Sequence, residues 1–163
     1  MQRQSALILT ICLMLVMPTS MAKQTVGWVE RAQIYPGEVV LKARIDSGAK
    51  TSSLHCDCAA PVMQGGKQGL SFTVRDYQGN KVRFKKKVER IAKVKRHFGE
   101  RQARYVVRLG ICLGTTYKEV DVSLVDRSGM NYPLLIGREF LKDSHVIDPA
   151  LTYITKPACR VEK

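Results

Sequence analysis

The chain has 163 residues, with 27 Lys and Arg against 14 Asp and Glu, for a formal net charge of +13. That length suits one domain with a real core. The positive charge favours polyanionic partners such as lipid head groups, anionic envelope polymers or acidic peptides. A solvated basic face without a partner is an equal alternative.

Residues 1–22 have the pattern of a secretory signal peptide. Arg3 supplies the positive start, residues 6–17 are mostly apolar, and Ser20 and Ala22 put small residues at the two positions that a signal peptidase reads before cleavage after Ala22. An apolar run of this length is too short to cross a bilayer, which takes about 20 residues. We therefore expect cleavage, a mature domain of residues 23–163 without a transmembrane span, and a periplasmic or secreted location. Nucleic acid is not an expected partner in that compartment.

Alternation of apolar and polar residues dominates the mature chain and predicts many short strands. The first of them places Val39, Leu41, Ala43 and Ile45 on one face. In chain order, the expected strands cover residues 38–45, 70–76, 81–88, 103–109, 117–126, 132–137, 145–148 and 151–155. The sequence favours a loop at 61–69 and a single helical turn at 138–143. These elements predict an all-β fold, either a barrel or a sandwich.

Four cysteines remain after cleavage, and an oxidising compartment permits disulfides between them. Cys56, Cys58, Cys112 and Cys159 allow three pairings, and the sequence does not choose among them. A bond between Cys56 and Cys58 is disfavoured because the two residues lie so close together in the chain.

The string His55-Cys56-Asp57-Cys58 also contains residue types that bind zinc. Adjacent strand residues point to opposite faces, so only His55 with Asp57, or Cys56 with Cys58, can converge. A metal site that uses His55, Cys56 and Cys58, or a four-cysteine site completed by the two later cysteines, is a weaker alternative to disulfides.

An isolated aspartate, Asp46, follows the strand expected at 38–45 and precedes Ser47 and Gly48. The tripeptide Asp-Ser-Gly by itself is typical of an ordinary turn. Gly48 also permits a tight turn and close approach of a second chain, and the Ser47 hydroxyl can brace a neighbouring backbone group. Such a loop can hold a carboxylate rigidly at the surface.

The residues around Asp46 carry a family resemblance. Asp46–Ala49 after an apolar strand, and later Leu135–Arg138 before a helical turn, are similar to the motifs of retropepsin-like aspartic peptidases. The strings GWVER, LKARIDSGAKTSSLH, DRSGMNYPLLIGREFL and VIDP resemble more closely a bacterial branch that carries the label ATP-dependent zinc protease. These motifs extend from Gly27 to Pro149 and so span most of the mature chain.

The resemblance implies a retropepsin-like closed β-barrel, a single lobe with one short helix. It also implies a homodimer in which two Asp46 carboxylates, one from each subunit, share a proton and activate water against a peptide bond. Ser47 would brace the paired loops across the two-fold axis, and Gly48 would admit the substrate backbone. The hairpin at 71–84 is a candidate flap by its position in the chain.

Three further residues are candidates for contact with a peptide or protein substrate: Ala49, Lys50 and Arg138. Arg138 could bind a substrate carboxylate through its two-pronged guanidinium. A structural role, in which Arg138 pairs with Asp143 or Asp148 and fixes the terminal strands, is the favoured alternative.

The zinc and ATP parts of the branch label lack their usual motifs. The sequence contains neither a glycine-rich loop ending in Gly-Lys-Ser/Thr nor a His-Glu-x-x-His string. We therefore expect no cofactor and no ATP site, with zinc a weak alternative. Two functions stay open beside the peptidase, namely a catalytically silent module that binds peptide or envelope polymer, and a metal-dependent hydrolase.

Overall fold

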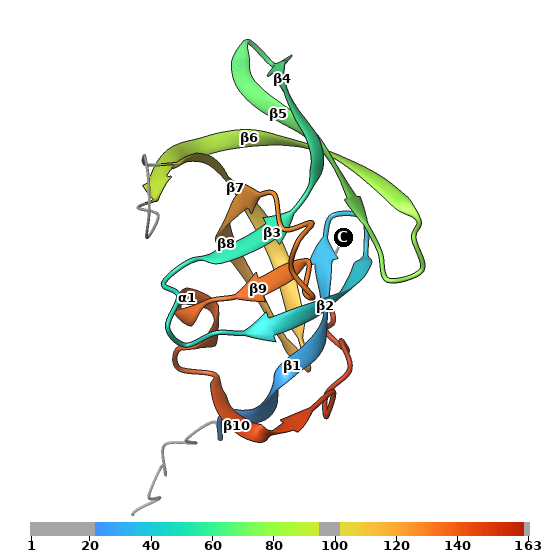
Figure 1. Cartoon of the computed structure of the whole chain (residues 1–163), viewed down its shortest axis with the longest axis vertical. Helices are drawn as coiled ribbons and strands as arrows, with labels where there is room; N and C mark the ends of the chain where they lie inside the picture. Colours follow the sequence, from blue (N-terminus) through green and yellow to red (C-terminus); the bar gives the residue numbers. More distant parts are fainter. Residues whose placement is uncertain (1–21, 95–101, 162–163) are drawn as a thin grey trace, which may run out of the picture.

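A computed structural model describes residues 22–94 and 102–161 of the chain (Figure 1). The predicted signal peptide, apart from its last residue, lies outside the described residues. Within those two ranges, no helix is long and apolar enough to span a membrane.

The described chain is almost entirely β-structure. The elements are β1 Gln24–Tyr35, β2 Val39–Ile45, β3 Ser52–His55, β4 Asp57–Gln64, β5 Lys67–Arg75, β6 Lys81–Val94, β7 Gln102–Leu113, β8 Thr116–Val125, β9 Leu134–Ile136, α1 Arg138–Leu141 and β10 His145–Thr152. The single helical turn lies where the sequence predicts it, and the two strands expected at the C-terminal end form one strand, β10.

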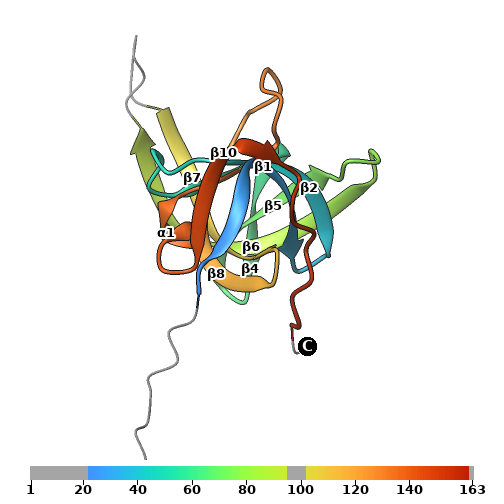
Figure 2. The same ribbon diagram turned by 90° about the horizontal axis from the view of Figure 1, so that it is seen from below.

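Six strands close into a barrel in the order β1-β2-β9-β3-β8-β7, and antiparallel pairing of β7 with β1 completes the ring. β1 is long enough to pair with three strands. Its first half pairs with β10, and its second half pairs with β2 and β7. Figure 2 shows β10 beside β1 on the outside of the barrel. The prediction of a closed all-β barrel with one short helix is confirmed.

β6, β5 and β4 continue the sheet beyond β7 as an arm that projects from the barrel (Figure 1). The hairpin predicted from residues 70–76 and 81–88 is part of this arm. The prediction of a loop at 61–69 is wrong, because β4 and β5 pair there and turn at Gly65 and Gly66. Both glycines have positive φ, 56° and 74°, as a tight hairpin turn requires. This outer hairpin is largely exposed, so its strands do not need the apolar alternation that would have revealed them.

The barrel interior is filled by apolar side chains, and the face predicted for β2 is confirmed. Val39, Leu41, Ala43 and Ile45 are at most 6% exposed. β1 was missed because a register shift between Gly27 and Val29 interrupts its alternation. Its buried apolar residues are Val26, Val29, Ala32 and Ile34.

A buried carboxylate, Glu30, anchors the C-terminal segment to β1. Its oxygens accept hydrogen bonds from the backbone N–H groups of Gly27 (2.8 Å), Ile154 (3.2 Å) and Thr155 (3.0 Å), and from the Thr155 hydroxyl (3.1 Å). Glu30 is 0% exposed, so these four donors replace the water that the carboxylate loses on folding. The segment is also tied to β7 by a disulfide between Cys112 and Cys159.

We expect Glu30→Ala to lower the free energy of unfolding by about 3 kcal/mol, because it leaves buried donors without acceptors. Urea denaturation followed by circular dichroism measures the change. Glu89→Ala, which removes an exposed carboxylate on β6, is the control and should stay within about 0.5 kcal/mol of the parent chain. Equal stabilities for the two variants would contradict the anchoring role of Glu30.

Candidate functional site

Asp46 lies in the turn that follows β2, and its carboxylate is held from one side. The Asp46 backbone N–H donates to the Ile136 carbonyl oxygen at 2.9 Å. Oδ1 of the carboxylate accepts the N–H groups of Gly48 (2.9 Å) and Ala49 (3.2 Å). Oδ2 accepts no hydrogen bond from the described residues. The turn therefore orients the carboxylate through Oδ1 and leaves the other oxygen available.

The start of α1 packs directly on this turn. The N–H groups of Arg138 and Glu139 donate to the carbonyl oxygens of Ala49 (2.8 Å) and Lys50 (3.1 Å). Gly137 lies against the backbone of Thr51. A Cβ added at Gly137 would stand 2.8 Å from the Thr51 carbonyl carbon, and a backbone atom cannot move aside as a flexible side chain can. The glycine before α1 is thus required for the close approach of two backbones.

Arg138 has a structural role, but the partners expected for it are wrong. Its Nη1 donates to the carbonyl oxygens of Ser47 (2.7 Å) and Gly48 (3.0 Å). It forms no ion pair with Asp143 or Asp148 within the described ranges. Arg138 therefore braces the Asp46 turn rather than the terminal strands.

The other candidates of the turn lie together at the surface because they are consecutive. Ser47, Gly48 and Lys50 are exposed, and Ala49 is half-buried. The Lys50 ammonium forms an ion pair with the Glu139 carboxylate at 3.8 Å, and 77% of the lysine side chain is exposed. A substrate or a second chain can therefore reach this turn from solvent.

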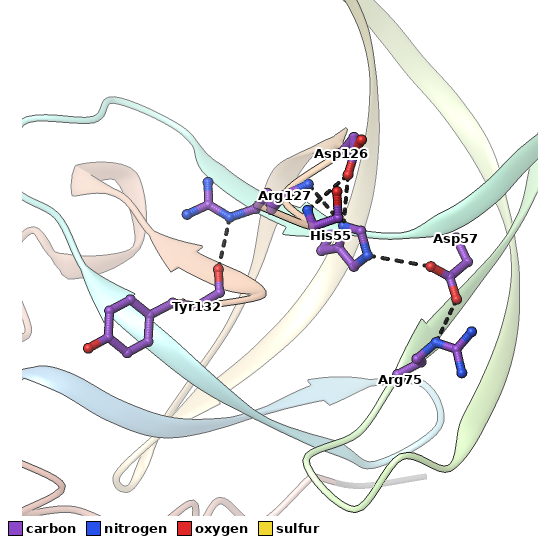
Figure 3. Close-up of polar contacts among 7 residues, drawn as sticks. His55, Asp57, Arg75, Asp126, Arg127 and Tyr132 are labelled. Carbon is purple, nitrogen blue, oxygen red and sulfur yellow. Dashed lines mark hydrogen bonds and ion pairs between the residues drawn. The ribbon is translucent and has the colours of Figure 1, made fainter. Parts of the chain in front are cut away.

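His55 and Asp57 converge as the strand geometry predicts, but as part of a polar chain (Figure 3). Nδ1 of His55 accepts the Arg127 backbone N–H at 2.9 Å, and Nε2 stands 3.4 Å from the Asp57 carboxylate. Asp57 accepts in turn from Nε of Arg75 at 2.7 Å, and Asp126 lies 3.7 Å from Nδ1 of His55. This chain ties β4 and β5 of the arm to β3 of the barrel.

The four-cysteine zinc site is wrong, because Cys112 and Cys159 are bonded to each other. Among the described residues, no group of three or more His, Cys, Asp or Glu side chains could hold a metal ion. Cys56 packs half-buried against the barrel core, while the side chain of Cys58 is not among those described.

Arg127 is a functional candidate that the sequence did not single out. It is 8% exposed, and its guanidinium donates to Ser53 Oγ and to the Tyr132 carbonyl oxygen, each at 3.0 Å. No carboxylate of the described chain comes within ion-pair distance of it. Burial lowers the pKa of Arg127, the charges of Arg104 and Arg44 lower it further, and the charge of Asp46 acts in the opposite direction. Arg127 is thus a buried cation whose pKa is affected by the charge of Asp46, and such a cation is suited to bind an anion.

Two cavities open beside this arginine. One of about 380 Å³ is lined by Ala49, Lys50 and Thr51 of the Asp46 turn together with Arg90, Arg104 and Arg127. The other, of about 410 Å³, shares Arg104 and Arg127 and also touches Asp126 and Met130. Four basic side chains, those of Lys50, Arg90, Arg104 and Arg127, therefore surround the space next to the turn. They lie far apart in the sequence, so no local pattern indicates that they meet.

The candidate flap does not lie over Asp46. Gly37, in the β1–β2 turn, lies against the side chains of Val82 and Phe84. A Cβ added at Gly37 would stand 3.1 Å from the Val82 side chain and 3.2 Å from the Phe84 side chain. The hairpin at 71–84 therefore packs at the opposite end of β2. The part of the arm that borders the Asp46 turn is the far end of β6, which supplies Arg90, Ala92 and Val94 to the smaller cavity.

Comparison with known proteins identifies the family. Residues 25–158 match the family described as RimB-like, retropepsin-like aspartic endopeptidase RimB. The chain belongs to this RimB-like family. The resemblance carried by the Asp46 and Gly137 motifs is therefore confirmed, and so is the retropepsin-like barrel.

A crystal structure of a Legionella pneumophila protein of unknown function has a TM-score of 0.70 and 34% identity, and the match covers 83% of this chain and 100% of that one. Curated relatives named probable alpha-L-glutamate ligase are 34% identical in Shewanella pealeana and 31% identical in Desulfotalea psychrophila. These matches cover 72% and 83% of this chain, but only 26% and 30% of the relatives. The chain thus spans less than a third of their length.

We expect Arg138→Ala to loosen the Asp46 turn, because two charge-assisted hydrogen bonds to its carbonyl groups are lost. Amide hydrogen exchange of Gly48 and Ala49, followed by NMR, should accelerate by about tenfold. Lys50→Ala is the matched control, since its exposed ion pair contributes little to the turn. Unchanged exchange in Arg138→Ala would contradict the bracing role.

Proposed function

We propose that this RimB-like protein is an exported aspartic endopeptidase that acts as a homodimer. The observation that carries the proposal is the Asp46 carboxylate, which is oriented through Oδ1 by two backbone N–H groups while Oδ2 is left available. A second subunit would bring an identical carboxylate to the two-fold axis, since this chain contains one such turn.

Two carboxylates at close range cannot both stay ionised, so the pair would hold one shared proton. The ionised member would take a proton from water as the water attacks the peptide carbonyl carbon. The protonated member would donate to the carbonyl oxygen and stabilise the tetrahedral intermediate. The carboxyl that took the proton from water would then pass it to the amide nitrogen, so that the C–N bond breaks and an amine and a carboxylic acid leave. Arg138 would serve this chemistry indirectly, by fixing the turn that orients both acids.

Peptides rich in acidic side chains are the substrate class that we propose. The curated relatives are named probable alpha-L-glutamate ligase, and from that name we take glutamate as the component of the substrate proposed for this chain. The cavity beside the Asp46 turn supports this choice, because Lys50, Arg90, Arg104 and Arg127 line it. Carboxylates bind guanidinium groups through paired, charge-assisted hydrogen bonds.

The Asp46 assignment is tested with Asp46→Asn, which keeps the shape of the side chain but removes its acid–base function. Cleavage of an oligoglutamate peptide, followed by mass spectrometry, should fall on the order of 10³-fold. Glu89→Gln is the control, since that exposed residue lies outside the turn. Sedimentation of the parent chain should show a dimer at assay concentration. Equal cleavage by the parent and by Asp46→Asn would exclude the mechanism.

The acidic preference is tested with Arg104→Gln, which removes one cation from the cavity. We expect KM for oligoglutamate to rise about tenfold with kcat little changed, because a charge-assisted contact of the bound substrate is lost. Lys85→Gln, on the exposed face of β6, gives the control for net charge. A parent protein that cleaves oligoglutamine as well as oligoglutamate would contradict this substrate class. Salt-sensitive binding of oligoglutamate without any cleavage would favour a silent binding module instead.

A further inference from the structure

A further cavity lies at the other end of β2, away from Asp46. Its volume is about 850 Å³, roughly twice that of either cavity beside Arg127. It is formed by the β1–β2 turn, β6, β8 and the C-terminal segment, and its lining includes Tyr35, Glu38, Lys86, Tyr117, Glu119 and Cys159. Neither the peptidase mechanism nor the acidic-peptide cavity uses any of these residues.

The separation of the two sites follows from the length of β2. This strand spans Val39–Ile45, and a strand rises about 3.3 Å per residue, so its ends lie roughly 20 Å apart. Figure 1 shows β2 running from the β1–β2 turn to the loop beside α1. A group bound at the turn therefore cannot touch Asp46 of the same subunit.

Two tyrosines form the aromatic part of the cavity. The rings of Tyr35 and Tyr117 meet edge to face, with centroids 5.6 Å apart and planes at 84°. Gly110 on β7 makes room for this arrangement, since an added Cβ there would overlap the Tyr117 ring and hydroxyl. Aromatic faces and phenol oxygens together attract cations.

Two carboxylates add negative charge beside the rings. Glu38 has a φ of 53°, in the left-handed region that side chains rarely adopt, so the turn holds this residue in a strained conformation. Burial raises the pKa of Tyr35 and the charge of Glu38 raises it further, while burial, Glu119 and Tyr35 raise the pKa of Tyr117. The phenols therefore stay protonated and neutral, so the negative charge in this part of the cavity comes from the two carboxylates.

The remaining wall is fixed before any ligand arrives. Cys159 is covalently bonded to Cys112 on β7, and the N–H of Ala158 donates to the Gly114 carbonyl oxygen at 2.8 Å. Because the C-terminal segment is held at both points, the cavity loses little conformational entropy when it is filled.

We propose that this cavity binds a primary ammonium or guanidinium group on an alkyl chain. Among the described residues that line it, two carboxylates and two aromatic rings stand against one basic side chain, that of Lys86. This is an acidic, aromatic site on a chain with 27 basic and 14 acidic residues. The ligand class includes free diamines and the lysine or arginine side chains of a polypeptide. Because Lys86 lines the same cavity, its ammonium would compete with the ligand for these carboxylates.

The experiment titrates the full-length, disulfide-bonded chain with 1,5-diaminopentane and, in a separate arm, with blocked lysine, using calorimetry and NMR. Blocked norleucine is the neutral probe of matched shape. We expect both amines to bind with a Kd of about 1 mM or tighter, and norleucine not to bind. The stronger of the two amine arms identifies a free diamine or a polypeptide side chain as the source. Shifts should be confined to the signals of the residues that line this cavity, Glu38, Lys86 and Glu119 together with the two tyrosines.

Substitutions with opposite expected signs make the test sharp. The double variant Glu38→Gln with Glu119→Gln should weaken amine binding at least tenfold, since both counter-charges are lost. Lys86→Gln should strengthen it several-fold, because the internal competitor is gone, and a purely structural role for Lys86 would not produce that gain. Glu89→Gln should change nothing, and thermal denaturation checks that each variant is folded. Equal binding of norleucine, or unchanged affinity in the folded double variant, would overturn the proposal.

Discussion

The contact between Gly137 and the backbone of Ala49 and Thr51 is the constraint on which the Asp46 turn depends. Two loops far apart in the chain meet there without any side chain between them, so the Arg138 guanidinium can reach the carbonyl groups of the turn. Ile136 holds the Asp46 backbone from the same side. A carboxylate positioned by backbone atoms of two connected elements keeps its orientation better than one on a free loop, which is what acid–base chemistry requires.

β1 gives the barrel its closure and also fixes the end of the chain. It pairs with β2, β7 and β10, and its buried Glu30 accepts hydrogen bonds from the segment after β10. A carboxylate inside a protein is stable only when donors replace its hydration, and here those donors are backbone N–H groups that need partners themselves. The disulfide between Cys112 and Cys159 adds a covalent link within the same region. The C-terminal segment is therefore part of the barrel and can form a fixed cavity wall.

The sequence predicted the features that depend on contacts between residues close together in the chain. The alternation of Val39, Leu41, Ala43 and Ile45 revealed β2, and the hydrogen bonds within the Asp46 turn join residues two and three positions apart. The rest depends on contacts between distant segments. Arg127 becomes notable only when folding buries it near Arg104 and the Asp46 turn. The partners of Arg138 and the place of the 71–84 hairpin likewise follow from packing, and an exposed hairpin such as β4–β5 needs no alternation at all.

The two ends of β2 differ in charge, and their separation decides whether the difference matters. At one end, Lys50 and three arginines surround the cavity beside Asp46, and at the other Glu38 and Glu119 face two tyrosines. Charges separated by more than a Debye length, about 8 Å at physiological salt, are largely screened where solvent reaches them. The strand holds the two groups roughly 20 Å apart, so neither cancels the field of the other. A single small barrel can therefore present a basic surface next to the proposed catalytic acid and an acidic, aromatic cavity at its opposite end.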